Sequence, residues 1–354
     1  MKGPPLVRGV VLLAFLLLGF VLGGSASARS ELANPLVEHW GGTAWAQVSV
    51  PSSGGLTLDT VIAPSATDVW AFGDSPVAIH WDGTAWRRVT LPTPKGLFAQ
   101  FVGAAAVSPH DIWVVGDRAI DHWNGRRWKV VPGLPARAEL YGVTALAAND
   151  VWAVGQVDSR ALVLHWNGKA WKRVPTPAPA QSPALTSSSL AAVAASSSRS
   201  VWAVGQYSIH TSSIRGSRAL TLNWNGSRWK VVPNPYFVAH HVSSLSGVAA
   251  PSASGVWAVG SANHKGGAQH ALAERWNGKR WSVFRVPGPR LAGVSALASN
   301  DAWAAGGPDG SGRVMRWNGK VWAVATKLDR KHGVGAVAEV SPTDVWAVGG
   351  RFTY

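Results

Sequence analysis

Tryptophan recurs in this chain in one fixed pattern that accounts for all 21 of its tryptophans. Seven lie in the phrase Asp-Val-Trp-Ala-Val-Gly or a close variant, and fourteen form seven pairs in the phrase Trp-Asn-Gly-x-x-Trp or a close variant. The single tryptophans are Trp70, Trp113, Trp152, Trp202, Trp257, Trp303 and Trp346. The pairs are Trp40/Trp45, Trp81/Trp86, Trp123/Trp128, Trp166/Trp171, Trp224/Trp229, Trp276/Trp281 and Trp317/Trp322. A repeat of this length is typical of propellers, solenoids and arrays.

Each repeat unit divides into four short extended segments. In the unit over 140–174, the pattern predicts strands over 140–145, 151–154, 161–166 and 169–174, separated by turn residues. We name these strands a, b, c and d in chain order. Strand a is rich in alanine and glycine in most units, so we expect it to lie innermost, where only small side chains fit.

The turn between strands c and d carries the strongest local signal. Five units have Asn-Gly at this turn, one has Asp-Gly and one has Gly-Gly. These dipeptides suit a two-residue type I′ hairpin, in which both central residues have positive φ. Such a turn would place Trp166 opposite Lys169 and Leu164 opposite Trp171, so the two tryptophans would form a diagonal pair on one face. We expect these pairs to pack against an adjacent unit.

The two ends of the repeat array are incomplete in complementary ways. The first strands, over 37–40 and 44–48, correspond to c and d alone, and the last, over 334–338 and 345–348, correspond to a and b alone. Pairing of these ends would complete one unit and close a ring. The sequence therefore predicts an all-β, seven-bladed β-propeller with four-stranded blades, closed by N-terminal strands c and d pairing with C-terminal strands a and b.

The glycines after strand b and the paired tryptophans resemble the kelch-type propeller repeat. Glycine doublets occur at 306–307 and 349–350, and Trp166 with Trp171 is similar to the aromatic pair of that repeat. Most units have one glycine instead of two, and the c–d turn is shorter than in kelch proteins. The phrase Val-Trp-Ala-Val-Gly also resembles tectonin-type lectin propellers, which implies glycan binding. The copper radical oxidases with kelch-like domains use a cysteine–tyrosine cofactor, which a chain without cysteine cannot form.

Residues 1–28 are interpreted as a signal peptide. A positively charged start and an apolar run over 10–22 precede a small-x-small cleavage site at 26–28. Cleavage would leave one propeller domain over 29–354, secreted or at the cell surface and without stable membrane insertion. The alternative is an uncleaved anchor, but the apolar run is short against the ~20 residues that span a membrane. The absence of cysteine excludes disulfides and thiolate metal sites, and we expect a bacterial, monomeric protein.

The net charge of +15 predicts attraction to anionic partners. Basic residues concentrate in the c–d turns and on strand d, the outer edge of each blade, where lysine and arginine also block edge-to-edge aggregation. We expect a glycan, an anionic cell-surface polymer or a protein as the partner. Nucleic acid is not expected, because the chain is exported and its tryptophans are expected to be buried instead of stacked on bases.

Aspartates precede strand b in five units, and histidines precede the strand-c tryptophan in four. The aspartates are Asp68, Asp111, Asp150, Asp301 and Asp344, and the histidines are His39, His80, His122 and His165. Each aspartate is interpreted as a turn cap that accepts bonds from nearby backbone amides. The histidines are interpreted as packing groups, because one per blade would lie too far from the next to share a metal ion. No cofactor is implied.

The most irregular region is the candidate binding site. Chain direction alternates along a blade, so the b–c and d–a connections emerge on one face. Long connections over 206–218, 261–269 and 233–242 carry four of the 11 histidines, and a fifth, His270, directly follows the second of these segments. Binding residues concentrate on loops held by a rigid frame, although an insertion with no role would look the same. The candidate ligand-binding residues are Tyr207, His210, Arg215, Tyr236, Phe237, His240, His241, His264 and His270.

Catalytic motifs are absent from the sequence. There is no Gly-x-Ser-x-Gly elbow, no His-Glu-x-x-His helix and no phosphate-binding glycine loop. We therefore predict an exported binding scaffold, not an enzyme, that recognises a glycan, a cell-wall polymer or a protein through loops on one face. One alternative is a polysaccharide hydrolase or lyase whose carboxylates meet in the central channel. Another is a structural module without a small ligand.

Overall fold

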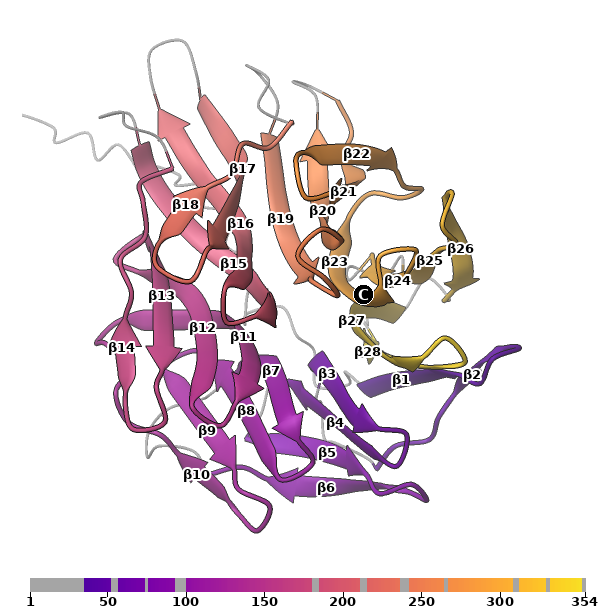
Figure 1. The fold of residues 1–354 in the computed structure, drawn as a ribbon. Coiled ribbons are helices and arrows are strands. Elements are labelled where there is room, and N and C mark those ends of the chain that lie inside the picture. The colour runs from indigo at the N-terminus through magenta and orange to yellow at the C-terminus, as the bar shows by residue number, and fades with distance from the viewer. Residues whose placement is uncertain are drawn as a thin grey trace, which may run out of the picture.

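The computed structural model describes residues 35–51, 57–73, 76–92, 100–179, 185–210, 215–235, 242–263, 267–307, 312–328 and 332–351. These residues form seven four-stranded antiparallel sheets, or blades, arranged around a common axis (Figure 1). The predicted signal peptide over 1–28 lies outside the described residues. Within the described part of the chain, no helix is long and apolar enough to cross a membrane.

Six blades are formed by four consecutive strands, a to d in chain order. Blade 1 contains β3 (Leu58–Ser65), β4 (Asp68–Gly73), β5 (Val77–Trp81) and β6 (Trp86–Thr90). Blade 2 contains β7 (Phe101–Ser108), β8 (Asp111–Gly116), β9 (Ala119–Trp123) and β10 (Trp128–Val130). Blade 3 contains β11 (Ala138–Ala147), β12 (Asp150–Val157), β13 (Arg160–Trp166) and β14 (Trp171–Arg173). Blade 4 contains β15 (Leu185–Ser197), β16 (Ser200–His210), β17 (Arg215–Trp224) and β18 (Trp229–Val231). Blade 5 contains β19 (Val242–Ala249), β20 (Val256–Asn263), β21 (His270–Trp276) and β22 (Trp281–Arg285). Blade 6 contains β23 (Leu291–Ala298), β24 (Asp301–Gly306), β25 (Arg313–Trp317) and β26 (Trp322–Lys327).

Blade 7 joins the two ends of the described chain. Its strands a to d are β27 (His332–Ser341), β28 (Asp344–Arg351), β1 (Pro35–Trp40) and β2 (Trp45–Gln47). β1 pairs antiparallel with β28, with Val37 opposite Val348, and the sheet order is β2-β1-β28-β27. Figure 1 shows β1 and β2 beside β27 and β28. The predicted number of blades and the predicted ring closure are confirmed.

Strands a surround the axis, because each contacts the strand a of both neighbouring blades. All seven contain a bulge near their start, such as that between Leu140 and Gly142. A Cβ atom on Gly142 would lie 2.9 Å from the Cα of Ala192 in the next blade, and one on Gly103 would lie 2.9 Å from the Cα of Gly142. The backbones therefore meet across blade boundaries, and the expectation of small innermost side chains is confirmed.

The glycine that follows Trp-x-Val on strand b lies against the same bulge. A Cβ atom on Gly155 would lie 1.9 Å from the carbonyl oxygen of Glu139, and one on Gly116 would lie 1.7 Å from that of Gln100. No side chain fits at such distances. Glycine at this position therefore does more than end strand b. It is required because strands a and b lie too close together here for a side chain.

The c–d hairpin differs from the prediction. Trp166 lies directly opposite Trp171, and the equivalent tryptophans pair in the same way in every blade, so four residues instead of two connect the strands. Gly168 has a φ of 87° while Asn167 has no positive φ, so the turn is not type I′. The Asn167 Oδ1 atom instead accepts hydrogen bonds from the amides two and three residues later, each at 3.0 Å. This side-chain bonding closes a wider loop, so strand d begins at Trp171 and the tryptophans are opposite each other instead of diagonal.

The paired tryptophans of one blade pack around the strand-b tryptophan of the preceding blade. The strand-c ring lies 5.1–5.8 Å from the strand-b ring. The strand-d ring meets it edge-on, at 5.2–5.5 Å and interplanar angles of 75–88°. All seven strand-b tryptophans are buried. Every blade boundary therefore contains one three-tryptophan cluster, and edge-on aromatic contacts add about 0.5–1.5 kcal/mol each beyond burial of the ring area.

Aspartate and histidine join strands b and c in four blades. In blade 3, Asp150 Oδ1 accepts hydrogen bonds from Trp152 Nε1 and from His165 Nε2, both at 2.9 Å. The His165 ring lies 4.3 Å from the Trp152 ring. The aspartates thus bind side chains instead of capping backbone amides as predicted, and the histidines pack as expected. The equivalent Asp–His bonds are Asp68–His80, Asp111–His122 and Asp344–His39.

Blades 4, 5 and 6 depart from this arrangement. In blade 6, Asp301 binds Arg316 through two hydrogen bonds, and the guanidinium lies 4.8 Å from the Trp303 ring. Blades 4 and 5 have Ser200 and Gly255 in place of the aspartate, and their strand-c residues are asparagine and arginine. At the position before the strand-c tryptophan, histidine is therefore present only in blades where an aspartate faces it.

We expect Asp150→Ala to lower the free energy of unfolding by about 1–3 kcal/mol, because it leaves the buried Trp152 indole N–H without its acceptor. Urea unfolding followed by tryptophan fluorescence measures the effect. Ser200→Ala is the matched control, since Trp202 Nε1 has no hydrogen-bond partner among the described residues. That control should change stability by less than about 0.5 kcal/mol. Equal effects of the two substitutions would contradict a stabilising role for the Asp–His–Trp contact.

Candidate functional site

Blade 4 extends farthest on the face that carries the b–c connections. β15 has 13 residues and β16 has 11, and Figure 1 shows β16 and β17 projecting beyond the neighbouring blades. Within the segment 206–218, which was predicted as a loop, Tyr207 pairs with Arg218 and His210 pairs with Arg215. The prediction of a long loop is therefore wrong over most of this segment, where the chain forms a projecting β-ribbon.

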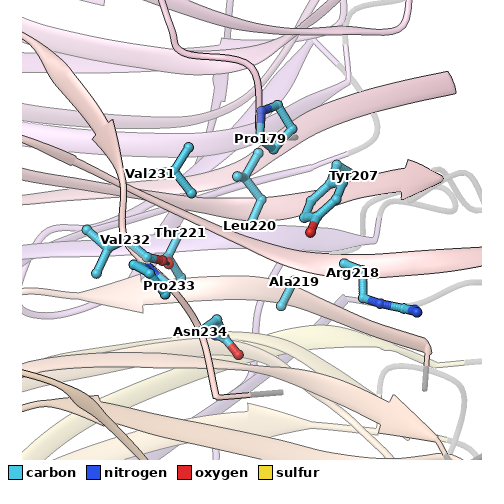
Figure 2. A pocket seen from close by; sticks show the side chains of 10 residues that line it. All are labelled: Pro179, Tyr207, Arg218, Ala219, Leu220, Thr221, Val231, Val232, Pro233 and Asn234. Atoms are coloured by element: carbon cyan, nitrogen blue, oxygen red, sulfur yellow. Dashed lines mark hydrogen bonds between the residues drawn. The ribbon is translucent and has the colours of Figure 1, made fainter. Parts of the chain in front are cut away.

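A cavity of about 250 Å³ lies at the base of this ribbon. Its walls come from β16, β17 and β18, and from the connections of blade 4 to blades 3 and 5. The lining residues are Pro179, Tyr207, Arg218, Ala219, Leu220, Thr221, Val231, Val232, Pro233 and Asn234. Figure 2 shows the hydroxyl of Tyr207 pointing to the side of the cavity where Arg218 and Asn234 lie. Apolar walls with a few convergent polar groups are typical of a ligand site.

Two polar side chains of the cavity are almost fully buried. Tyr207 and Arg218 are each 4% exposed. Burial raises the pKa of the Tyr207 hydroxyl, and the positive charge of Arg218 acts in the opposite direction. The Arg218 Nη1 atom donates a hydrogen bond to the carbonyl oxygen of Ser217 at 3.2 Å. A cation held among apolar groups favours a ligand that combines an apolar group with a negative charge.

Hydrogen bonds between blades fix the shape of the cavity. The amide of Ala219 donates to Ser243 Oγ on the next blade at 3.1 Å. The Thr221 hydroxyl donates to the carbonyl oxygen of Val232 at 2.5 Å, which holds the connection after β18 against β17. Asn234 extends this connection to blade 5, where its Nδ2 atom donates to Glu274 Oε2. The walls therefore combine strands of blade 4 with connections that hydrogen bonds hold against the blades.

The predicted site residues do not form one cluster in the described part of the chain. Tyr207 lines the cavity, but His210 alternates with it along β16 and lies on the opposite face of the sheet. Arg215 and His270 begin β17 and β21, and neither lines the cavity. Five predicted residues lie outside the described residues: Tyr236, Phe237, His240, His241 and His264.

Sequence reasoning missed most of the cavity wall. Arg218 and Asn234 lie within segments predicted as long connections, but the candidate residues there are histidines, aromatic residues and Arg215. Leu220 and Val231 belong to regular strands and have no distinguishing feature in the sequence. The cavity arises because strand d of blade 4 ends at Val231 while β17 continues past it, which only the pairing register reveals.

Three blades carry a buried carboxyl group between blades. The residue two positions before the strand-c tryptophan is leucine, isoleucine or methionine in four blades but Asp121, Glu274 or Glu38 in the others. Asp121 and Glu274 are fully buried, and Glu38 is 7% exposed. Burial raises the pKa of Asp121 to about 7 and that of Glu274 to about 8, the latter against the hydrogen bond from Asn234. Burial also raises the pKa of Glu38, and the charge of His332 opposes it.

Carboxylates also meet beside the inner strands on the b–c face. Asp117 forms an isolated β-bridge with Glu139, and Glu139 accepts hydrogen bonds from Tyr141 and Gln156. Burial, and then the nearby charge of Glu139, raise the pKa of Asp117, while Arg118 lowers it. Asp117 and Glu139 are thus one pair of neighbouring carboxyl groups of the kind that a glycosidase uses. Across the described ranges, no group of three or more histidine, aspartate or glutamate side chains is arranged to hold a metal ion.

Comparison with known proteins supports the fold and leaves the family open. The chain matches no protein-family model, and no curated protein has a significantly similar sequence. A structure of YCF48 bound to D1 peptide has a TM-score of 0.58 and 14% identity, with 90% of this chain and 97% of that chain covered. YCF48 from Cyanidioschyzon merolae has a TM-score of 0.59 and 16% identity, covering 88% and 99%. The WD40 repeats of RRP9 have a TM-score of 0.57 and 10% identity, covering 84% and 96%. The chain has a WD40-like, seven-bladed propeller fold.

We expect Asp121→Asn to raise the free energy of unfolding by about 2 kcal/mol more at about pH 8 than at about pH 5. The folded-state pKa of Asp121 is raised from 3.8 to about 7, so its contribution to stability is complete only below pH 3.8 and is lost as the pH rises from there through about 7. Chemical unfolding at both pH values measures the difference. Asp158→Asn is the control, because Asp158 is exposed. A gain in stability that is equal at both pH values would contradict ionisation of Asp121 as the cause.

Proposed function

We propose that this protein is an exported binding propeller that captures a protein partner at the cavity of blade 4. The observation that carries the proposal is the cavity itself, built from the rigid blade and from the connections that tie it to its neighbours. The site is preorganised, so little conformational entropy is lost when a ligand binds. Catalysis is not part of the proposal, because no carboxylate, histidine or serine is among the residues that line the cavity.

The chemistry of the walls supports a peptide segment as the ligand. Leucine, valine and proline side chains form most of the surface, and Arg218 adds one buried positive charge. An apolar side chain next to an aspartate, a glutamate or a terminal carboxylate would complement both features. Among the similar structures, YCF48 is bound to a peptide. Propellers with this fold therefore include at least one peptide binder, which is consistent with the proposal.

A glycan is the second candidate. It is supported by the resemblance of the strand-b phrase to tectonin-type lectin propellers, and the kelch-type resemblance leaves it equally open. A polysaccharide hydrolase or lyase would instead use the inner carboxylates Asp117 and Glu139, which lie away from the cavity lining. Substitutions at the cavity would therefore affect peptide capture, whereas substitutions of Asp117 and Glu139 would affect hydrolysis or cleavage of a polysaccharide.

We expect Val231→Trp to weaken capture of peptides by about tenfold or more, because the larger ring fills the cavity from its solvent side. Val231 is 36% exposed, so the substitution avoids the core. The chain without residues 1–28 would be applied to an immobilised library of short peptides and to a glycan array. Peptides that bind should be enriched in an apolar residue next to an acidic group.

Val130→Trp is the matched control. Val130 occupies the same position of strand d in blade 2 and is 41% exposed, but it is not among the residues that line the cavity of blade 4. Its binding profile should equal that of the unaltered chain. Binding to glycans alone, or equal loss in both variants, would contradict the assignment of a peptide site to blade 4.

Export is part of the same proposal and has its own test. Expression of the full chain in a bacterial host with a general secretion pathway should yield a secreted product whose N-terminus is Arg29. Intact-mass analysis of the culture medium measures it. Retention of residues 1–28 on a membrane-bound product would show an anchor in place of a cleaved signal.

A further inference from the structure

The outer rim of the propeller is charged with one sign. We define the rim as the c–d hairpins together with strands d, all of which are described. Its basic residues are Arg87, Arg88, Arg126, Arg127, Lys129, Lys169, Lys172, Arg173, Arg228, Lys230, Lys279, Arg280, Arg285, Lys320 and Lys327, and all are exposed. Asp82 is the one acidic residue of the rim, and it forms an ion pair with Arg87 at 2.7 Å. Blades 1 to 6 therefore carry two or three cations each on the rim, and blade 7 carries none.

Carboxylates close to the rim are turned inward. The aspartates that precede strand b bind histidine or arginine side chains within the same blade, as Asp150 binds His165 at 2.9 Å and Asp301 binds Arg316. Asp121 and Glu274 are buried between blades. The positive potential of the rim is therefore not cancelled by acidic groups beside it.

Protection of the blade edge does not explain this selection of sign. A charge of either sign on strand d would block pairing with another sheet, so aspartate and glutamate would also serve. The hairpin tips also carry cations, although residues such as Arg126 and Lys169 lie in a turn and not in a strand edge. The single sign of the charge therefore requires another explanation than protection of the sheet edge.

The side chains of the rim offer hydrogen-bond donors and few acceptors. Guanidinium and ammonium groups only donate. In the five Asn-Gly hairpins the asparagine Oδ1 already accepts two backbone amides at 2.9–3.1 Å, which leaves the amide nitrogen as the outward donor. A glycan presents hydroxyl groups that must also donate, whereas a phosphate backbone only accepts. The rim also has no exposed aromatic ring on which a base could stack.

We infer that the rim of blades 1 to 6 binds a linear phosphate polymer. The basic side chains of the rim would contact only the charged phosphate groups of the polymer backbone. The charged side chains of the rim are not among the residues that line the cavity of blade 4, although β18 contributes to both surfaces. The inference does not depend on the function proposed for that cavity. The probe is inorganic polyphosphate, and its dissociation constant would be measured by titration over a range of salt concentrations.

The test compares two variants that each lose three positive charges. The rim variant is Lys129→Gln, Lys172→Gln and Lys230→Gln, which share the position after the strand-d tryptophan in blades 2, 3 and 4. The control variant is Arg118→Gln, Arg137→Gln and Arg160→Gln, all exposed on the b–c face. The rim variant should bind about tenfold more weakly at ~0.1 M salt, and its plot of log K against log salt should be shallower by about 2. The control should bind within about twofold of the unaltered chain.

Each other outcome overturns the inference. Equal loss in the two variants would assign binding to net charge and not to the rim. Tighter binding of polygalacturonate than of polyphosphate at equal charge would show that hydroxyl and carboxylate groups are preferred. Tighter binding of single-stranded DNA at equal phosphate number would show contacts to bases. Val231 lies on rim strand β18 but carries no charge, so Val231→Trp removes none of the positive charges and should leave polyphosphate binding within about twofold of the unaltered chain. Failure of the peptide site and failure of the rim are therefore distinguishable.

Discussion

The packing of three tryptophans across every blade boundary is the interaction on which this structure depends. Two rings on strands c and d of one blade contact the buried strand-b ring of the preceding blade, with the strand-d contact always edge-on. A single blade cannot bury its own tryptophans, because the partner ring belongs to its neighbour. Stability is therefore a property of the closed ring, and each boundary contributes through the same geometry. The bulges and glycines of strands a and b serve this packing. They let the inner backbones approach closely enough for the outer tryptophan rings to meet.

The fold was predictable from sequence because tryptophan, a rare residue, recurs at fixed positions in every repeat unit. The number of blades, the complementary ends and the crowding of the inner strands all follow from tryptophan and glycine spacing. The hairpin register was not predictable from Asn-Gly alone, because the asparagine side chain competes for the turn amides and widens the loop. The Asp–His contact was missed for a related reason. Asp150 and His165 are 15 positions apart and meet only once the pairing of β12 with β13 is known.

The candidate site lies where the repeat is least regular. Blade 4 lacks the aspartate before strand b and has the longest strands, and blade 5 has a buried glutamate bonded to the connection that leaves blade 4. The cavity was beyond sequence reasoning because it follows from a difference in strand length, with β18 ending while β17 continues. Tyr207 was identified through its segment, but its partner Arg218 was not, since a strand arginine has no sequence signal of burial. Irregularity of the repeat thus indicated the blade that contains the cavity, but not the residues that line it.

The composition of blade 7 determines when the ring can close during synthesis and folding. Its strands c and d leave the ribosome first and its strands a and b leave last, so Trp40 and Trp45 have no Trp303 to contact until almost the whole chain exists. Such sequence-distant pairing delays folding. The two ends of the described chain therefore pair late in folding. The closed ring then gives every blade a neighbour on both faces, with the strand-a edge of each sheet at the axis and the strand-d edge at the rim.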